Sequence, residues 1–152
     1  MGIRIGIVGA GTTVAIADRH VEGFLAQEGR CTVAAVCSRT LEGCRRVCIR
    51  HGLDGVRMTT RLEELLDVVD AVVLCTPNQF HLPYTERAVE RGKAVLLEKP
   101  LGLQTAPPGQ AERLLARRGA RVMVAYVYRY TAVVGRLRAL LRQRMGRVYL
   151  AQ

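Results

Sequence analysis

Short apolar runs alternate along this chain with segments whose apolar residues recur at helical spacing. The runs, rich in valine, isoleucine and leucine, predict strands at 3–8, 32–37, 55–59, 71–75, 94–97 and 122–127, with a further strand starting at 147. The helical spacing predicts helices at 16–28, 41–51, 62–66, 80–91, 107–118 and 131–144. Gly52 and Gly92 are expected to end two of these helices, and Thr105 to cap another at its start.

This alternation predicts an α/β fold, a doubly wound parallel sheet of the Rossmann type with helices on both faces in three αβα layers. Strands that are apolar throughout are typical of parallel strands buried on both faces. Right-handed crossovers then wind the chain from one strand to the next. Because ligands of such sheets bind beyond the carboxyl ends of the strands, the chemistry is expected in the segments that follow each strand.

The length and charge of the chain narrow its class. A chain of 152 residues is the size of one domain. Its formal charge is +10, and arginine is dense from 113 to 147. Such a basic stretch is typical either of a nucleic-acid surface or of solvated helix faces. We expect solvated faces and no nucleic-acid partner, because the arginines are spread through helical patterns and aromatic residues are few.

The sequence also predicts where the protein resides. No apolar run approaches the roughly 20 residues that span a bilayer, and the first residues lack the ordered regions of a signal peptide. We therefore expect a cytoplasmic protein with no membrane partner. Its five cysteines form no CxxC pair and only three histidines accompany them, so we expect reduced thiols and no metal site. Whether the chain forms a homo-oligomer is left open.

Two candidate sites follow the first two strands. After strand 3–8 come Gly9, Gly11, Thr12 and Thr13. Glycines at this point let the backbone approach a pyrophosphate, and the next helix directs its free N–H groups at that charge. A third glycine of the GxGxxG pattern is absent, which predicts a longer turn and a helix that starts near residue 16.

The second strand ends in Ser38 and Arg39, where NAD enzymes usually carry an acidic residue for the ribose 2′-hydroxyl. An arginine beside a serine can instead hold a 2′-phosphate, so NADP is expected ahead of NAD. The alternative is that Arg39 is an ordinary surface arginine.

Two further motifs follow consecutive strands, namely Cys75-Thr76-Pro77-Asn78 with His81, and Glu98-Lys99-Pro100. With the segment 125–130, this order resembles the N-terminal nucleotide-binding domain of the Gfo/Idh/MocA family (glucose–fructose oxidoreductase, inositol dehydrogenase and relatives). The resemblance runs from residue 5 to residue 148. The chain departs from the family pattern in its longer glycine turn and in Ala125, where glycine is usual.

The resemblance implies a set of roles. The glycine turn would wrap the pyrophosphate, and Lys99 would be a catalytic residue that hydrogen-bonds the reacting hydroxyl. The Lys99–Pro100 peptide is expected in cis. The residues expected at the cofactor are Gly9, Gly11, Thr12, Thr13, Ser38, Arg39, Cys75, Thr76, Pro77, Asn78, His81, Glu98, Lys99 and Arg129, and Tyr130 would border the same cleft.

The implied function is the nucleotide-binding domain of an oxidoreductase that moves hydride between NAD(P) and a sugar-like or polyol substrate. The general base of such enzymes lies in a second, sheet-containing α+β domain. We expect residues 1–146 to form the nucleotide domain and 147–152 to begin that absent second domain, so the chain alone is expected to be inactive. One alternative is a non-catalytic module that binds or senses NAD(P), and another is a basic nucleic-acid-associated protein built on a Rossmann scaffold.

Overall fold

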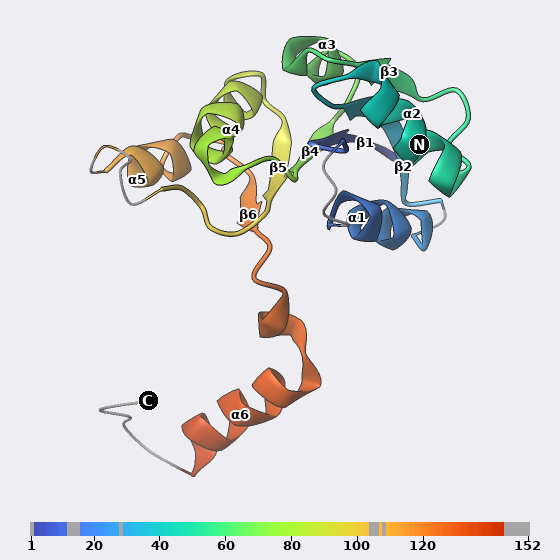
Figure 1. The fold of residues 1–152 in the computed structure, drawn as a ribbon. Helices are drawn as coiled ribbons and strands as arrows, with labels where there is room; N and C mark the ends of the chain where they lie inside the picture. The colour runs from blue at the N-terminus through green and yellow to red at the C-terminus, as the bar shows by residue number, and fades with distance from the viewer. Residues whose placement is uncertain (1, 12–15, 28, 104–106, 108, 145–152) are drawn as a thin grey trace.

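The computed structural model describes residues 2–11, 16–27, 29–103, 107 and 109–144. In this part of the chain one parallel sheet of six strands runs in the order β3-β2-β1-β4-β5-β6 (Figure 1). The strands are β1 (Ile3–Val8), β2 (Cys31–Cys37), β3 (Arg57–Thr59), β4 (Ala71–Leu74), β5 (Ala94–Leu97) and β6 (Val122–Val124). The helices are α1 (Ile16–Leu25), α2 (Leu41–His51), α3 (Leu62–Leu66), α4 (His81–Glu90), α5 (Gln110–Leu115) and α6 (Ala132–Gln143), with 3-10 turns η1 (Asn78–Phe80) and η2 (Val127–Tyr130). The predicted doubly wound parallel sheet is confirmed.

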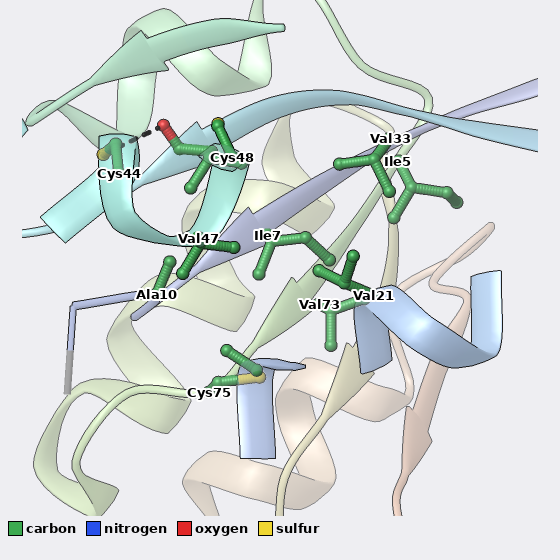
Figure 2. Packing of buried hydrophobic residues seen from close by; sticks show 12 residues of the cluster. Ile5, Ile7, Ala10, Val21, Val33, Cys44, Val47, Cys48, Val73 and Cys75 are labelled. Atoms are coloured by element: carbon green, nitrogen blue, oxygen red, sulfur yellow. Dashed lines mark hydrogen bonds between the residues drawn. The ribbon is translucent and has the colours of Figure 1, made fainter. Parts of the chain in front are cut away.

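The core lies in two apolar clusters, one on each face of the sheet. Successive strand residues point to opposite faces, so Ile7 of β1 enters the cluster beneath α1 and α2, whereas Val8 enters the cluster beneath α3 and α4. Figure 2 shows side chains of β1, α1 and α2 meeting in the first of these clusters. Each fully buried residue such as Ile7 or Leu74 contributes about 1.5–3 kcal/mol through burial. Helices on both faces give the three layers that the sequence predicts.

The last described helix stands apart from the two clusters. After β6 the chain turns through η2, and α6 extends away from the sheet (Figure 1). Thr131 caps α6 by accepting a hydrogen bond from the Val134 N–H, and none of the helix residues is buried. In the part of the chain that the structure describes, none of the helices combines the length and the apolar character needed to cross a membrane.

Two predicted elements are shorter than expected because a glycine takes a left-handed backbone. Gly55 has φ of 68°, so β3 begins only at Arg57. Gly109 has φ of 73° and stands immediately before α5, which therefore starts at Gln110. Thr105, expected to cap this helix, lies outside the described residues.

A strand end and a helix start also differ from the expectation. β6 stops at Val124 because the Tyr126 N–H turns back to bond the Val124 carbonyl at 2.8 Å, which ends the ladder with β5. The helix predicted at 80–91 instead begins as the 3-10 turn η1 and continues as α4. The strand predicted from residue 147 lies outside the described residues.

An ion pair fixes the amino ends of the central strands. The Arg4 guanidinium donates to both carboxylate oxygens of Asp70, at 3.1 and 2.7 Å, and the Arg4 backbone N–H donates to the same carboxylate at 2.9 Å. These hydrogen bonds from Arg4 hold the pKa of Asp70 well below its usual range. Asp70 precedes β4, so the pair aligns β4 with β1.

We predict that Asp70→Asn lowers the free energy of unfolding at pH 7 and has a smaller effect near pH 3. The pKa of Asp70 is lower in the folded than in the unfolded chain, so its contribution is present above the unfolded pKa and is lost as pH falls. Urea denaturation at both pH values checks this. Asp67→Asn, which removes a different exposed pair with Arg91, is the control; an Asp70→Asn effect that grows on acidification contradicts the prediction.

Candidate functional site

The turn after β1 passes so close to the end of β4 that only glycine fits. Gly9 has φ of 95°, and a Cβ added there would lie 2.5 Å from the Cys75 carbonyl oxygen. Its N–H bonds the Cys37 carbonyl at 2.9 Å, which ties the turn to the end of β2 as well. The turn is therefore held closely against the carboxyl edge of the sheet.

The same turn packs against the first residues of α2. A Cβ on Gly11 would overlap the Ser38 hydroxyl, and one on Gly43 would lie 2.5 Å from that hydroxyl and 3.0 Å from the Gly11 Cα. Ser38 is 7% exposed, so it sits between two glycines rather than in solvent. Gly43 escaped the sequence analysis, although a glycine in the first turn of a helix is a recognisable signal for close backbone contact.

A cavity of about 360 Å³ opens at this edge, above the glycine turn. Its walls come from the residues that follow β1, β2, β3 and β4, as Rossmann sheets require. The lining residues are Val8, Gly9, Gly11, Cys37, Ser38, Arg39, Thr60, Leu62, Thr76, Pro77, Gln79, Phe80 and Tyr84. The structure thus brings together six of the predicted cofactor residues in one cavity.

An aromatic pair in this wall was missed from the sequence. The rings of Phe80 and Tyr84 lie 5.3 Å apart between centroids. They are four positions apart at the start of α4, which puts them on one helix face, and that spacing was the available signal. They give the cavity an apolar side suited to a flat ring.

His81 ties together the two loops that follow β4 and β5. Its ring is fully buried, with Nδ1 2.6 Å from the Pro100 carbonyl oxygen and Nε2 2.9 Å from the Thr76 carbonyl oxygen. Both ring nitrogens therefore face backbone, and His81 holds these loops in place from below. Contact with a cofactor, expected from the sequence, stays a prediction for this residue.

The other predicted residues are distributed around the cavity. Cys75 is buried behind the glycine turn, and burial raises the pKa of its thiol to about 12, so it is an unreactive thiol at neutral pH. Asn78 lines a separate hollow of about 130 Å³. Thr12 and Thr13 lie outside the described residues. Within the described ranges, no group of three or more His, Cys, Asp or Glu side chains could hold a metal ion.

A second cavity, of about 570 Å³, lies beyond the ends of β5 and β6. It collects Glu98, Lys99 and Arg129, whose roles at cofactor and substrate stay predictions. The Lys99–Pro100 peptide is cis, as predicted. Its remaining walls are Ile16, Ala125, Tyr126, Val127 and Tyr128. Tyr130 is 71% exposed and does not line this cavity.

Glu98 has a partner that the sequence did not suggest. Its Oε1 lies 2.8 Å from Nε2 of His20, which α1 supplies, and its Oε2 accepts the Lys99 backbone N–H at 3.3 Å. Both side chains are largely buried. The cavity that carries Lys99 is therefore linked to the helix that follows the glycine turn.

The fold, the glycine turn and the two cavities define a Rossmann-type dinucleotide-binding domain. The chain belongs to the oxidoreductase family with an NAD-binding Rossmann fold that is named Gfo/Idh/MocA, whose family model matches residues 3–126. The family predicted from the sequence is confirmed.

The similar proteins include enzymes named for a deoxysugar and for inositol. A dTDP-3,4-didehydro-2,6-dideoxy-α-D-glucose 3-reductase of Streptomyces violaceoruber is 35% identical over 86% of this chain and 38% of its own length. A 3-ketoreductase of Actinomadura kijaniata, solved with NADP and TDP-benzene, is 30% identical to this chain and has a TM-score of 0.77. The match covers 94% of this chain and 43% of the reductase chain.

A Bordetella pertussis dehydrogenase, solved with NADH and UDP-GlcNAcA, is similar in fold, with 24% identity and a TM-score of 0.85. The match covers 98% of this chain and 45% of the dehydrogenase chain. The chain spans less than half the length of each of these relatives.

We predict that Gly11→Ala destabilises the fold by about 1–3 kcal/mol, because the added methyl overlaps the Ser38 hydroxyl. Adding Ser38→Ala should recover part of this loss, since the nearest remaining side-chain atom would be the residue 38 Cβ at 3.2 Å. Urea denaturation measures both variants.

The matched control is Gly23→Ala, where a Cβ meets nothing within 4 Å in the interior of α1. It should stabilise the protein by about 0.5–1 kcal/mol. Equal effects of alanine at positions 11 and 23 would contradict the crowding argued for the glycine turn.

Proposed function

We propose that this chain binds a nicotinamide dinucleotide across the glycine turn, with NADPH preferred over NADH. The observation that carries the proposal is the glycine-only approach of Gly9 and Gly11, which brings backbone without side chains to the wall of a cavity of about 360 Å³. A turn of this kind before a helix accepts a pyrophosphate, and a side chain at either position would collide with Cys75 or Ser38 and displace the turn. Thr12 and Thr13, which follow in the sequence, are proposed to complete it.

The preference for NADPH rests on the adenosine end of the same cavity. Arg39 is exposed and lines the cavity, and no carboxylate is among the lining side chains in the described part of the chain. A guanidinium there suits a 2′-phosphate, whereas the missing carboxylate removes the usual partner of a 2′-hydroxyl. Solved relatives hold either NADP or NADH, so the specificity has to come from this chain's own residues.

Fluorescence titration of NADPH and NADH with the purified chain tests the binding itself. We expect saturable binding of both, with the lower dissociation constant for NADPH. A sample that is folded by circular dichroism and binds neither nucleotide at millimolar concentration would refute the proposal.

We predict that Arg39→Ala weakens NADPH binding about 10- to 100-fold and leaves NADH binding nearly unchanged. A hydrogen bond to a charged group contributes about 1.5–3 kcal/mol, and each 1.4 kcal/mol is tenfold in affinity. Arg45→Ala is the control, because Arg45 pairs with Glu42 on α2 and does not line the cavity. Equal losses for the two nucleotides would contradict a 2′-phosphate contact.

We further propose that the second cavity receives a sugar-like or polyol substrate. The exposed Lys99 would donate a hydrogen bond to the substrate oxygen whose carbon is oxidised or reduced, with Glu98 and Arg129 beside it. When bound, the nicotinamide supplies the hydride chemistry. The relatives named for inositol and deoxysugar substrates support this substrate class.

The general base is proposed to come from a second domain that starts at residues 147–152 and follows the nucleotide domain of residues 1–146. Each histidine of the chain is already engaged: His20 with Glu98, His51 with Asp18 at 2.8 Å, and His81 with two backbone carbonyls. None of the three lines the second cavity, where the substrate is proposed to bind. A non-catalytic, nucleotide-binding module is the second candidate, and this lack of an available base favours it for the isolated chain.

We predict that the 152-residue chain gives no reduction of NADP or NAD with a panel of inositols and sugars, although the same sample binds the nucleotide. An exposed ammonium group donates hydrogen bonds and has no acceptor, so Lys99 cannot replace the base. Absorbance at 340 nm follows the reaction. Turnover that disappears in Lys99→Ala would overturn this expectation.

The proposed setting is cytoplasmic, without a nucleic-acid or membrane partner. Arg87 of α4 pairs with Glu63, Arg91 just after α4 pairs with Asp67, and Arg117 just after α5 pairs with Glu86 and Glu90. Paired, separated charges support solvated faces rather than a continuous nucleic-acid surface. Whether the chain forms a homo-oligomer is a question for solution measurements.

A further inference from the structure

The carboxylate of Glu98 stands between two segments that are far apart in sequence. One oxygen faces Nε2 of His20 at 2.8 Å, and the other accepts the backbone N–H of Lys99 at 3.3 Å. The Glu98 N–H in turn bonds the Leu74 carbonyl of β4 at 3.0 Å. Glu98 is therefore fixed at its backbone and at both of its side-chain oxygens.

The geometry dictates the direction of these bonds. An ionised carboxylate only accepts hydrogen bonds, so His20 donates through Nε2 and Lys99 donates through its backbone N–H. The side chains of His20 and Glu98 are 14% and 11% exposed, so water competes little with this bond. A charge-assisted bond in such a setting restricts the carboxylate to one orientation.

We propose that His20 is a positioning residue for Lys99. By holding the Glu98 carboxylate, His20 fixes the acceptor of the Lys99 N–H, and so sets where the Lys99 side chain enters the second cavity. His20 belongs to α1, which follows the glycine turn, so the bond couples the helix of the nucleotide site to the residue at the substrate site. This role rests on the proposed function at one point, namely that Lys99 contacts the substrate.

The alternative is that His20 simply attaches α1 to the end of β5. The chain contains a matched pair that separates these explanations. His51 faces Asp18 at 2.8 Å, with the two side chains 8% and 13% exposed, and joins α1 to α2 rather than to the loop that carries Lys99. Loss of either histidine removes a shielded histidine–carboxylate bond to α1, but only loss of His20 alters the surroundings of Lys99.

The test uses the two lysines of the chain as reporters. Reductive methylation with ¹³C-formaldehyde gives one dimethyl NMR signal for each, and Lys99→Arg identifies the signal of Lys99. Lys93 is the internal reference. It precedes β5, whereas Glu98 follows β5, and its Nζ donates to the Val69 carbonyl at 2.9 Å. No nucleotide is needed, so failure here is distinct from failure of dinucleotide binding.

We expect His20→Ala to shift the Lys99 signal and leave the Lys93 signal in place, and His51→Ala to shift neither. His20→Gln, which retains an N–H donor, should return the Lys99 signal most of the way to that of the wild-type protein. Glu98→Gln keeps the volume of Glu98 but replaces one acceptor oxygen by a donor, so it should also shift the Lys99 signal. This variant tests the proposal even if His20→Ala does not fold.

Two results would overturn the proposal. One is a folded His20→Ala or Glu98→Gln protein whose Lys99 signal coincides with that of the wild type. The other is a Lys99 shift in His51→Ala as large as that in His20→Ala, which would mean that Lys99 reports loosening of α1 in general.

Discussion

The close approach of the Gly9 backbone to the Cys75 carbonyl is the constraint on which the proposed nucleotide site depends. It brings the turn after β1 against the end of β4, and the Gly11–Ser38–Gly43 contact brings the same turn against α2. These contacts leave no room for side chains, so the turn exposes backbone instead. A backbone surface offers N–H groups at fixed positions, which is what an anionic group needs from a protein.

A second level of organisation holds the loops around that turn. His81 lies between the loops after β4 and β5, with one ring nitrogen against a carbonyl oxygen of each loop, and the Glu98 carboxylate connects His20 of α1 to the Lys99 backbone. Each bond joins elements on different parts of the sheet edge. The loops carry the candidate chemistry, whereas these buried or largely buried groups fix where the loops lie.

Much of the fold could be predicted because its signals are local. The apolar runs at 3–8 and 94–97 match β1 and β5. Helical spacing followed by Gly52 correctly predicted that α2 ends at His51. Three of the predictions that failed at the ends of elements concern Gly55, Gly109 and Tyr126. There the backbone takes a left-handed conformation or a tight turn that apolar spacing does not report.

The sequence by itself determined the parallel sheet, the glycine turn, Arg39 at the end of β2 and Lys99 at the end of β5, because each follows a strand signal in the chain. Only the tertiary structure decided that Phe80 and Tyr84 share a wall with Ser38, that Gly43 meets Gly11, and that His20 pairs with Glu98. His20 and Glu98 are 78 positions apart. Contacts of this kind depend on the crossovers and on side-chain packing between elements, and no local periodicity carries that information.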